Sequence, residues 1–503
     1  MRGKRIAFGA LAASLLSVVV AGAPVTTASA APAPPYSAGN DTGSLFNVVR
    51  SMGVNQLWNQ HYSGQGIGVA LIDSGVTPVP GLTAGNVVNG PDLSLDAGTP
   101  SLRSLDDFGH GTHLAGIIAG RDSTAQNYGA YNDPSKFTGV APDATLVNVK
   151  VGAADGAVDV SQVIAALDWV VAHKDDPGLN IRVVNISFGT DSTQADQVDP
   201  LVYAAEAAWR AGLVVIAAAG NEGNTVSTLT DPATDPYVIA VGADGHYDKN
   251  GNKQYISSFS NAGSPGRSPD VVAPGQSITS LRDPGSFADT LYPGGRVGDP
   301  AGRFFRGSGT SQSAAVVTGV VADVLSKYPA MTPDQVKGTL MQYAVPLSGV
   351  SPSLQGAGEV NATKFPGLKT SGMPSYAQNW TPSDGSGSIE SSRGSAHLTA
   401  SNGDVLSGET TVFGAAFDGH SWTDNAWDAA SWEGGSWTGH SWTGHSWTGD
   451  AWTGHSWTTD EWAGHSWTDD SWDGHSWTGD SWSGHSWTDD TWTGHSWTGT
   501  TWG

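Results

Sequence analysis

Strand-length apolar runs alternate with helix-length amphipathic stretches over about residues 45–364. The runs contain Val, Ile and Ala over their whole length, which is typical of strands buried on both faces of a parallel sheet. This pattern predicts an α/β fold with a doubly wound, mostly parallel sheet, helices on both faces and functional sites at the carboxyl ends of the strands. The runs are Gly68–Asp73, 145–151, 182–188, 213–219 and 237–243, and the clearest helical stretches are 161–174 and 199–211.

Three glycine-flanked segments carry an Asp, a His and a Ser in that order. Asp73 ends the first apolar run, whereas His110 and Ser311 each begin a helix-like stretch. In nucleophilic acyl transfer, an imidazole base activates a hydroxyl group and a buried carboxylate orients the imidazole. The positions of the three residues at strand ends and helix starts allow them to converge, so the sequence indicates this chemistry.

The composition excludes several kinds of site. The chain has no cysteine, so it holds no cysteine nucleophile, disulfide or Cys-based zinc site. Its 23 Lys and Arg residues against 47 Asp and Glu residues give a net charge of −24. A basic surface for nucleic acid is therefore not expected.

Changes in composition divide the chain into five parts. Residues 1–30 combine a basic start, an apolar run and Ala-Ser-Ala, which predicts a secretory signal peptide. A membrane anchor is the alternative, but the run is short and broken by glycine. We therefore expect a secreted, extracellular protein without a membrane anchor after cleavage. The other parts are a short segment 31–44, the α/β domain 45–365, a linker 366–417 rich in Ser, Gly and Pro, and Trp-rich repeats 418–503.

The quoted motifs resemble those of the subtilisin-like serine proteases (subtilases, peptidase family S8), which share the order Asp, His, Ser. The similarity extends to Val-Ile-Ala-Ala-Ala-Gly-Asn-Glu-Gly at 215–223, Val-Asn-Ile-Ser-Phe-Gly at 184–189 and Gly-Ala-Gly-Glu-Val-Asn at 356–361. It covers about residues 45–364 and leaves out the repeats. The resemblance implies a serine-type endopeptidase, a hydrolase.

The resemblance assigns a role to each catalytic residue. It makes Ser311 the nucleophile, His110 the general base and later the general acid, and Asp73 the residue that orients His110. Asn221 and the backbone N–H of Ser311 would stabilise the oxyanion of the tetrahedral intermediate. Catalysis of this kind requires no cofactor. Relatives bind structural calcium, but no motif in this chain assigns its ligands.

The resemblance also assigns substrate binding to two short segments. The first would pair with an extended peptide as an added strand, and the small residues of the second would leave room for a bulky side chain. We therefore expect broad activity on protein or peptide substrates, with a preference for bulky apolar residues. The two segments are Ser187, Phe188 and Gly189, and Ala218, Ala219 and Gly220.

Two features depart from the family pattern. Ala315 stands where the family has a proline, four residues after the nucleophile. Because alanine is a good helix former, we expect altered local rigidity rather than lost chemistry. Only about 15 residues separate the predicted cleavage site from residue 45, too few for a folded inhibitory prodomain. Either folding proceeds unassisted, or the tail or a separate chain takes the place of the prodomain.

Three further polar residues lie near His110. His113 is one helical turn away, and we expect it to be structural. Asp106 and Asp107 either supply negative charge to the helix N-terminus or shape the non-primed substrate pockets; the first interpretation is favoured.

Tryptophan recurs at every fifth position from Trp422 to Trp502, seventeen times in all. From His445, histidine and aspartate add a ten-residue period. A five-residue period fits neither a helical stripe nor one face of a strand, so short strands or hairpins, or a stacked coil with several pentads per turn, are expected. Three functions stay open: adhesion to a polysaccharide or cell wall through the indoles, binding of divalent metal by His and Asp, and a self-packing stalk.

The alternative to an enzyme is an inactive protease-like scaffold that acts in surface or polysaccharide adhesion through the repeats. All of Asp73, His110, Ser311 and Asn221 are present, which favours the enzyme.

Overall fold

The computed structural model describes residues 36–245, 255–400, 404–414 and 416–417, and short strands at 437–438, 455–456, 475–478 and 497–498. The predicted signal peptide 1–30 lies outside the described residues, as do the first residues of the segment 31–44 and most of the repeats. Over the described ranges, no helix is both long and apolar enough to cross a bilayer.

Seven strands of the described chain form one parallel sheet in the order β2-β3-β1-β4-β5-β6-β7. This arrangement confirms the predicted α/β fold with a parallel sheet. The strands are β1 Gly68–Asp73, β2 Val87–Asp92, β3 Thr145–Lys150, β4 Ile181–Ile186, β5 Val214–Ala218, β6 Ile239–Asp244 and β7 Val271–Pro274. Two further strands, β8 Ile278–Leu281 and β9 Phe304–Gly307, pair with each other in an antiparallel hairpin.

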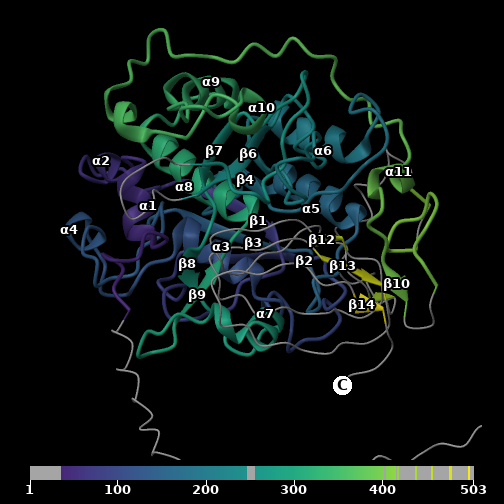
Figure 1. Ribbon diagram of the computed structural model, residues 1–503, viewed down its shortest axis with the longest axis horizontal. Helices are drawn as coiled ribbons and strands as arrows, with labels where there is room; N and C mark the ends of the chain where they lie inside the picture. The colour runs from purple at the N-terminus through teal and green to yellow at the C-terminus, as the bar shows by residue number, and fades with distance from the viewer. Residues whose placement is uncertain are drawn as a thin grey trace, which may run out of the picture. The chain divides into compact units, whose positions relative to one another are not determined.

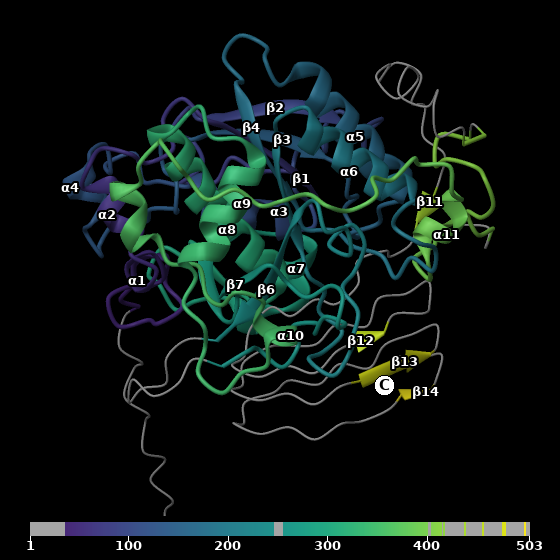
Figure 2. The ribbon, with the colours of Figure 1, turned by 90° about the horizontal axis from the view of Figure 1, so that it is seen from above.

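Helices cover both faces of the sheet (Figures 1 and 2). Helices α3 and α8 pack on one face, and α5 and α6 pack together on the other. The helices are α1 Leu45–Ser51, α2 Asn55–Trp58, α3 His110–Ala119, α4 Tyr128–Tyr131, α5 Val160–His173, α6 Pro200–Arg210, α7 Phe287–Leu291, α8 Thr310–Lys327, α9 Pro333–Tyr343, α10 Pro352–Gln355 and α11 Ile389–Arg393, with 3-10 turns η1 Pro293–Gly295 and η2 Ala362–Gly367.

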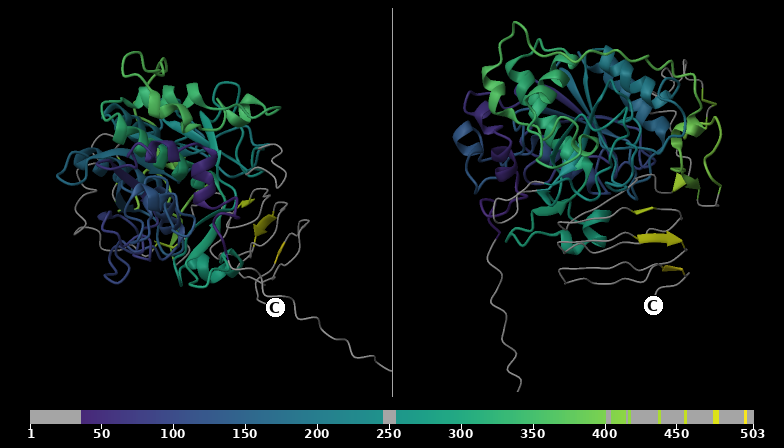
Figure 3. Two further views of the ribbon diagram at one scale, coloured as in Figure 1. Left: turned by 90° about the vertical axis from the view of Figure 1, so that its left-hand side faces the viewer. Right: turned by 45° about the horizontal axis from the view of Figure 1, so that its top comes forward.

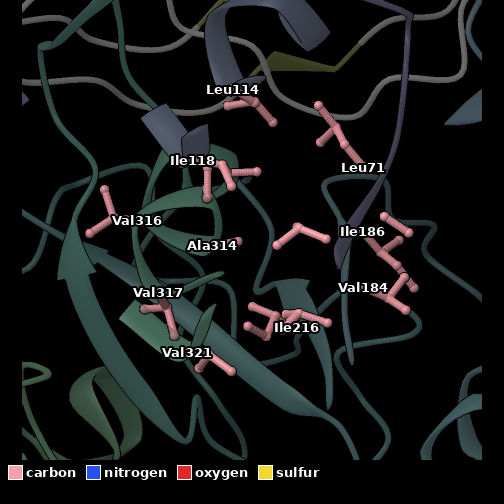
Figure 4. Packing of buried hydrophobic residues seen from close by; sticks show 14 of the residues in the cluster. Leu71, Leu114, Ile118, Val184, Ile186, Ile216, Ala314, Val316, Val317 and Val321 are labelled. Atoms are coloured by element: carbon pink, nitrogen blue, oxygen red, sulfur yellow. The ribbon is translucent and has the colours of Figure 1, made fainter. Parts of the chain in front are cut away.

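The main core lies between the sheet and the pair α3 and α8. Side chains of both helices meet those of β1, β4 and β5 there (Figure 4). All these residues are buried, so the start of each helix is held firmly against the sheet. They include Leu114 and Ile118 of α3, Val317 and Val321 of α8, and Leu71, Val184, Ile186 and Ile216 of the strands.

The order of the strands reverses at β1. The chain starts the sheet at β1, adds β3 and β2 on one side of it, and then continues with β4 on the other side. In open α/β sheets, ligands bind outside the carboxyl ends of the strands at such a reversal. The end of β1 is therefore the expected place for a site.

Part of the stretch expected to be a linker, residues 366–417, packs against the domain instead. The backbone of Tyr376 donates to the carbonyl oxygen of Asp334 in α9, and α11 packs on α5 and α6. Figure 3 shows this green to yellow-green stretch running along the domain. The sequence suggested a linker because its apolar residues occur singly among Ser and Gly. Several of them are nevertheless buried, among them Ile389, Leu398, Leu406 and Val412.

The described strands of the repeats pair at a fixed separation. His455 of β12 (His455–Ser456) pairs in parallel with His475 of β13 (His475–Thr478), and Trp477 pairs with Trp497 of β14 (Trp497–Thr498). Each pair joins residues twenty positions apart, which is four pentads. β11 (Trp437–Thr438) instead pairs antiparallel with β10 (Thr399–Ala400). The parallel pairing favours the stacked coil among the predicted arrangements, and the fold of the whole tail stays a prediction.

Candidate active site

His110 and Asp73 meet where α3 begins and β1 ends. The Nδ1 of His110 lies 2.7 Å from Oδ1 of Asp73, and the side chains are only 2% and 1% exposed. Asp73 is the last residue of the buried strand β1, and His110 is the first residue of α3. A carboxylate at this distance holds a proton on Nδ1, which leaves Nε2 as the basic nitrogen of the neutral ring.

Ser74, a residue that the sequence did not assign to the site, supports this pair. The backbone N–H of Ser74 donates to Oδ1 of Asp73 at 2.8 Å, and the Ser74 hydroxyl donates to Oδ1 of Asp106 at 2.7 Å. The same hydroxyl accepts the N–H of Gly111 at 2.9 Å. Ser74 therefore connects the end of β1 to the first turn of α3. Its position directly after Asp73 was the available signal.

Asp106 satisfies backbone donors around the start of α3. Its carboxylate accepts the N–H of Gly109 at 2.7 Å and that of Thr112 at 2.6 Å. Burial raises the pKa of Asp106, and these hydrogen bonds oppose that rise. The contacts agree with the favoured interpretation of this residue as a helix N-terminal group. Asp107 lies 3.8 Å from Nζ of Lys150, an ion pair at the carboxyl end of β3.

Asn221 is tied to the start of α8 through Thr310. Its Oδ1 accepts the backbone N–H of Thr310 at 2.8 Å and lies 3.0 Å from the Thr310 hydroxyl. These contacts make Oδ1 the acceptor end of the amide and turn Nδ2, the donor end, the other way. Thr310 immediately precedes Ser311, and the sequence gave it no role.

Ser311 lies in the first turn of α8, where backbone N–H groups have no acceptor within the helix. Such a turn stabilises negative charge. α8 packs against α3, so the helices that carry Ser311 and His110 lie on the same face of the sheet. α8 continues unbroken through the buried Ala315, the position where the family has proline.

The predicted substrate segments follow β4 and β5. Ser187, Phe188 and Gly189 come directly after β4, and the Phe188 ring is buried in the core, which anchors the backbone on either side. Ala218 ends β5, and Gly220 has a φ of 107°. A Cβ at Gly220 would lie 2.5 Å from Nδ2 of Asn261, so only glycine fits this turn. Both segments therefore lie at the same edge of the sheet as Asp73.

His113 is fully buried one turn after His110. Its Nε2 lies 3.2 Å from the carbonyl oxygens of Ile278 and Phe305, in the hairpin of β8 and β9. Burial, with a smaller contribution from His110, lowers the pKa of His113 to about 3. The ring is therefore neutral and joins α3 to the hairpin, which agrees with a structural role.

In the part of the chain that the structure describes, no group of three or more His, Cys, Asp or Glu side chains is arranged to hold a metal ion. Structural calcium stays an implication of the family resemblance, with no ligands assigned.

The sequence model of the subtilase family matches residues 64–365. The serine protease AprX of Bacillus subtilis is 36% identical over 310 residues, which are 60% of this chain and 66% of that protein. Subtilisin E of Bacillus subtilis is 36% identical over 293 residues, 56% of this chain and 62% of that protein. Subtilisin of Bacillus pumilus is 35% identical over 293 residues, 56% and 86% of the two chains. The matched region thus spans less than two thirds of AprX and of subtilisin E.

We predict that His113→Gln removes part of the acid sensitivity of the fold. In the unfolded chain His113 takes up a proton near pH 6.5, whereas in the folded chain it does so only near pH 3. The unfolded state therefore binds more protons between these values, and stability falls as the pH falls through this window. Between pH 7.5 and 4.5 this residue should cost about 2–3 kcal/mol.

The measurement is the free energy of unfolding in denaturant at both pH values, in a Ser311→Ala background that prevents self-digestion. The loss on acidification should be smaller in the double variant than in Ser311→Ala alone. An equal loss in the two proteins would contradict the burial of a neutral ring.

Proposed function

Because the chain belongs to the subtilase family, we propose that it is a serine endopeptidase that hydrolyses peptide bonds through an acyl-enzyme intermediate. The observation that carries the proposal is the 2.7 Å contact between His110 and Asp73, at the strand end where the order of the sheet reverses. The hydrogen bond from the backbone of Thr310, the residue before Ser311, to Asn221 gives further support. Asp73, His110, Ser311 and Asn221 are the proposed catalytic residues.

In the first half of the proposed reaction, Oγ of Ser311 attacks the substrate carbonyl carbon while Nε2 of His110 takes the hydroxyl proton. Asp73 stabilises the imidazolium that forms and keeps its orientation. The oxyanion accepts hydrogen bonds from Nδ2 of Asn221 and the backbone N–H of Ser311. The C–N bond then breaks, and His110 gives its proton to the departing amine. In the second half, His110 activates a water molecule that hydrolyses the ester and restores Ser311.

The proposed substrates are proteins or peptides in extended conformation. Backbone pairing with Ser187, Phe188 and Gly189 would bind them with little dependence on sequence. The small side chains at Ala218, Ala219 and Gly220 leave space for a bulky apolar residue before the cleaved bond. We propose broad specificity with that preference, and secretion directed by residues 1–30.

For the repeats we propose adhesion to a polysaccharide or cell wall. The repeats carry seventeen tryptophans at a fixed spacing, and the flat face of an indole suits a sugar ring. The pairing of residues twenty positions apart supports a regular array, because equivalent pentads then lie next to one another.

We predict that Ser311→Ala abolishes turnover. Loss of the nucleophile in subtilisin lowers kcat on the order of a millionfold, and casein hydrolysis should fall accordingly. Only the parent protein should react with a serine-directed phosphonate. Ser326→Ala, in the same helix, is the control and should keep both properties. A folded parent protein that neither hydrolyses casein nor reacts with the phosphonate would favour the inactive scaffold.

We predict that Asn221→Ala lowers kcat by about 10²–10³, the loss found for one oxyanion donor in subtilisin. The Michaelis constant should change little, because the donor acts on charge that develops only in the transition state. Asn86→Ala is the matched control, since Asn86 donates to two carbonyl groups, of Ala119 and Ala144, outside the site. An unchanged kcat in Asn221→Ala would remove this residue from the oxyanion hole.

We predict that the full-length Ser311→Ala chain is retained on insoluble glycans such as cellulose, chitin or bacterial cell wall. Replacing four tryptophans that are twenty positions apart with alanine should remove most of the retention, because these side chains would act together. The four are Trp437, Trp457, Trp477 and Trp497. Retention that a chelator abolishes would instead indicate metal binding, and no retention under either condition would indicate a stalk.

A further inference from the structure

Two loops flank the carboxyl end of β1. One follows β3 and runs to Asp159, and the other follows β4 and runs to Asp199. Because β3 and β4 are both direct neighbours of β1, and strands lie about 4.8 Å apart, the loops begin roughly 10 Å apart. A peptide paired with Ser187, Phe188 and Gly189, as proposed above, would run between the two loops.

The segment that contains α11 contacts both loops. Ser392 and Arg393 are successive residues, and each side chain reaches the aspartate that caps one of the following helices. The Ser392 hydroxyl donates to Oδ1 of Asp199, the cap of α6, at 2.9 Å. The Arg393 Nε donates to Oδ2 of Asp159, the cap of α5, at 2.6 Å. One short helix thus joins the ends of two loops that are far apart in the sequence.

Further contacts hold the loop after β4. The Thr190 hydroxyl donates to the carbonyl oxygen of Ser392 at 2.6 Å, and the backbone N–H of Ser395 donates to Oδ1 of Asp191 at 2.7 Å. Thr190 is fully buried and directly follows Gly189, the last residue of the proposed peptide-binding edge. A shift of α11 would therefore move this edge.

Three apolar residues from the segment after α11 pack on the loop after β3. Leu398, Leu406 and Val412 form a small buried cluster with Ala153 and Ala157 of that loop. The Arg393 guanidinium also donates to the carbonyl oxygens of Gly408 and Thr410, which holds this stretch in place.

The ion pair between Arg393 and Asp159 has the properties of a positioning contact. Both side chains are 0% exposed. A buried ion pair adds little stability compared with a packed apolar pair, because both charges lose their hydration. Its geometry, however, is fixed by several directed hydrogen bonds.

From these contacts we propose that residues 389–400 and 404–414 act as a brace that sets the spacing of the two loops, with Arg393 as a positioning residue for substrate binding. The proposal rests on the endopeptidase function given above. The two loops would bind the acyl side of an extended peptide. A change in the brace should therefore weaken the binding of long substrates and leave the bond-breaking groups in place.

The test compares full-length variants on two peptide substrates with the same leaving group. The short substrate has one residue on the acyl side of the cleaved bond, and the long one has four. Arg393→Gln should lower kcat/KM for the long substrate about tenfold and change the value for the short one by less than about twofold. Arg393→Lys should lower kcat/KM for the long substrate less than Arg393→Gln does, since a cation can still reach Asp159.

Lys337→Met is the matched control. Lys337 is also 0% exposed, pairs with Asp270 at 3.0 Å and donates to the carbonyl oxygens of Pro236 and Val238, but it lies at the amino ends of β6 and β7. The Lys337→Met variant should have a lower melting temperature. Its long-to-short ratio, which is kcat/KM for the long substrate divided by kcat/KM for the short one, should be unchanged. Thr190→Val removes only the bond to Ser392, so it tests the brace even if Arg393→Gln folds poorly; it should lower the ratio about threefold.

A wild-type long-to-short ratio in Arg393→Gln or in Thr190→Val, with folding confirmed by circular dichroism, would overturn the brace. Turnover of the short substrate by the wild-type protein is a separate readout, because it reports on the proposed peptidase function alone.

Discussion

The rest of the site depends on the pairing of β1 with both β3 and β4. This pairing places Asp73 at the middle of the carboxyl edge of the sheet, with one loop on either side. It also fixes where α3 and α8 can pack, because their apolar faces must cover β1, β4 and β5. The start of α3 and the end of β1 then meet at one place, and α8, which carries Ser311, packs against α3 on the same face of the sheet.

Most polar contacts at this place fix orientation. Oδ1 of Asp73 accepts hydrogen bonds from the His110 ring and from the Ser74 backbone. Oδ1 of Asn221 accepts a hydrogen bond from the backbone of Thr310. Asp73 and Asn221 are thus each held by a hydrogen bond outside the proposed chemistry, the first from the Ser74 backbone and the second from Thr310. Enzymes of this kind gain most of their rate from groups that are oriented before the reaction starts. Burial strengthens these contacts, because water no longer competes for the donors.

The sequence was a good guide for strands of five or six residues that are buried along most of their length, whereas the four-residue strands β7 and β8 were not predicted. The apolar runs predicted for β1, β3, β4, β5 and β6 begin and end within two residues of the observed strands. β2 was missed because its Asn-Gly-Pro-Asp segment is partly exposed at the edge of the sheet and has no apolar pattern. Local motifs singled out Asp73, His110, Asn221 and Ser311 as candidates. They could not show that Ser74 and Asp106 join β1 to α3, because that contact depends on the approach of distant segments. The same holds for Arg393, which is 234 positions from Asp159.

The buried pair of Arg393 and Asp159 also bears on how this protein can be divided into modules. The family match ends at residue 365, which makes that position the obvious place to cut or fuse the chain. A cut there would remove Arg393 from this pair together with the segment that packs on the loop before Asp159. The structural module therefore extends at least to Phe417. A domain exchange that respects this boundary would carry the brace with the catalytic part and leave the tryptophan repeats as the part that can be replaced.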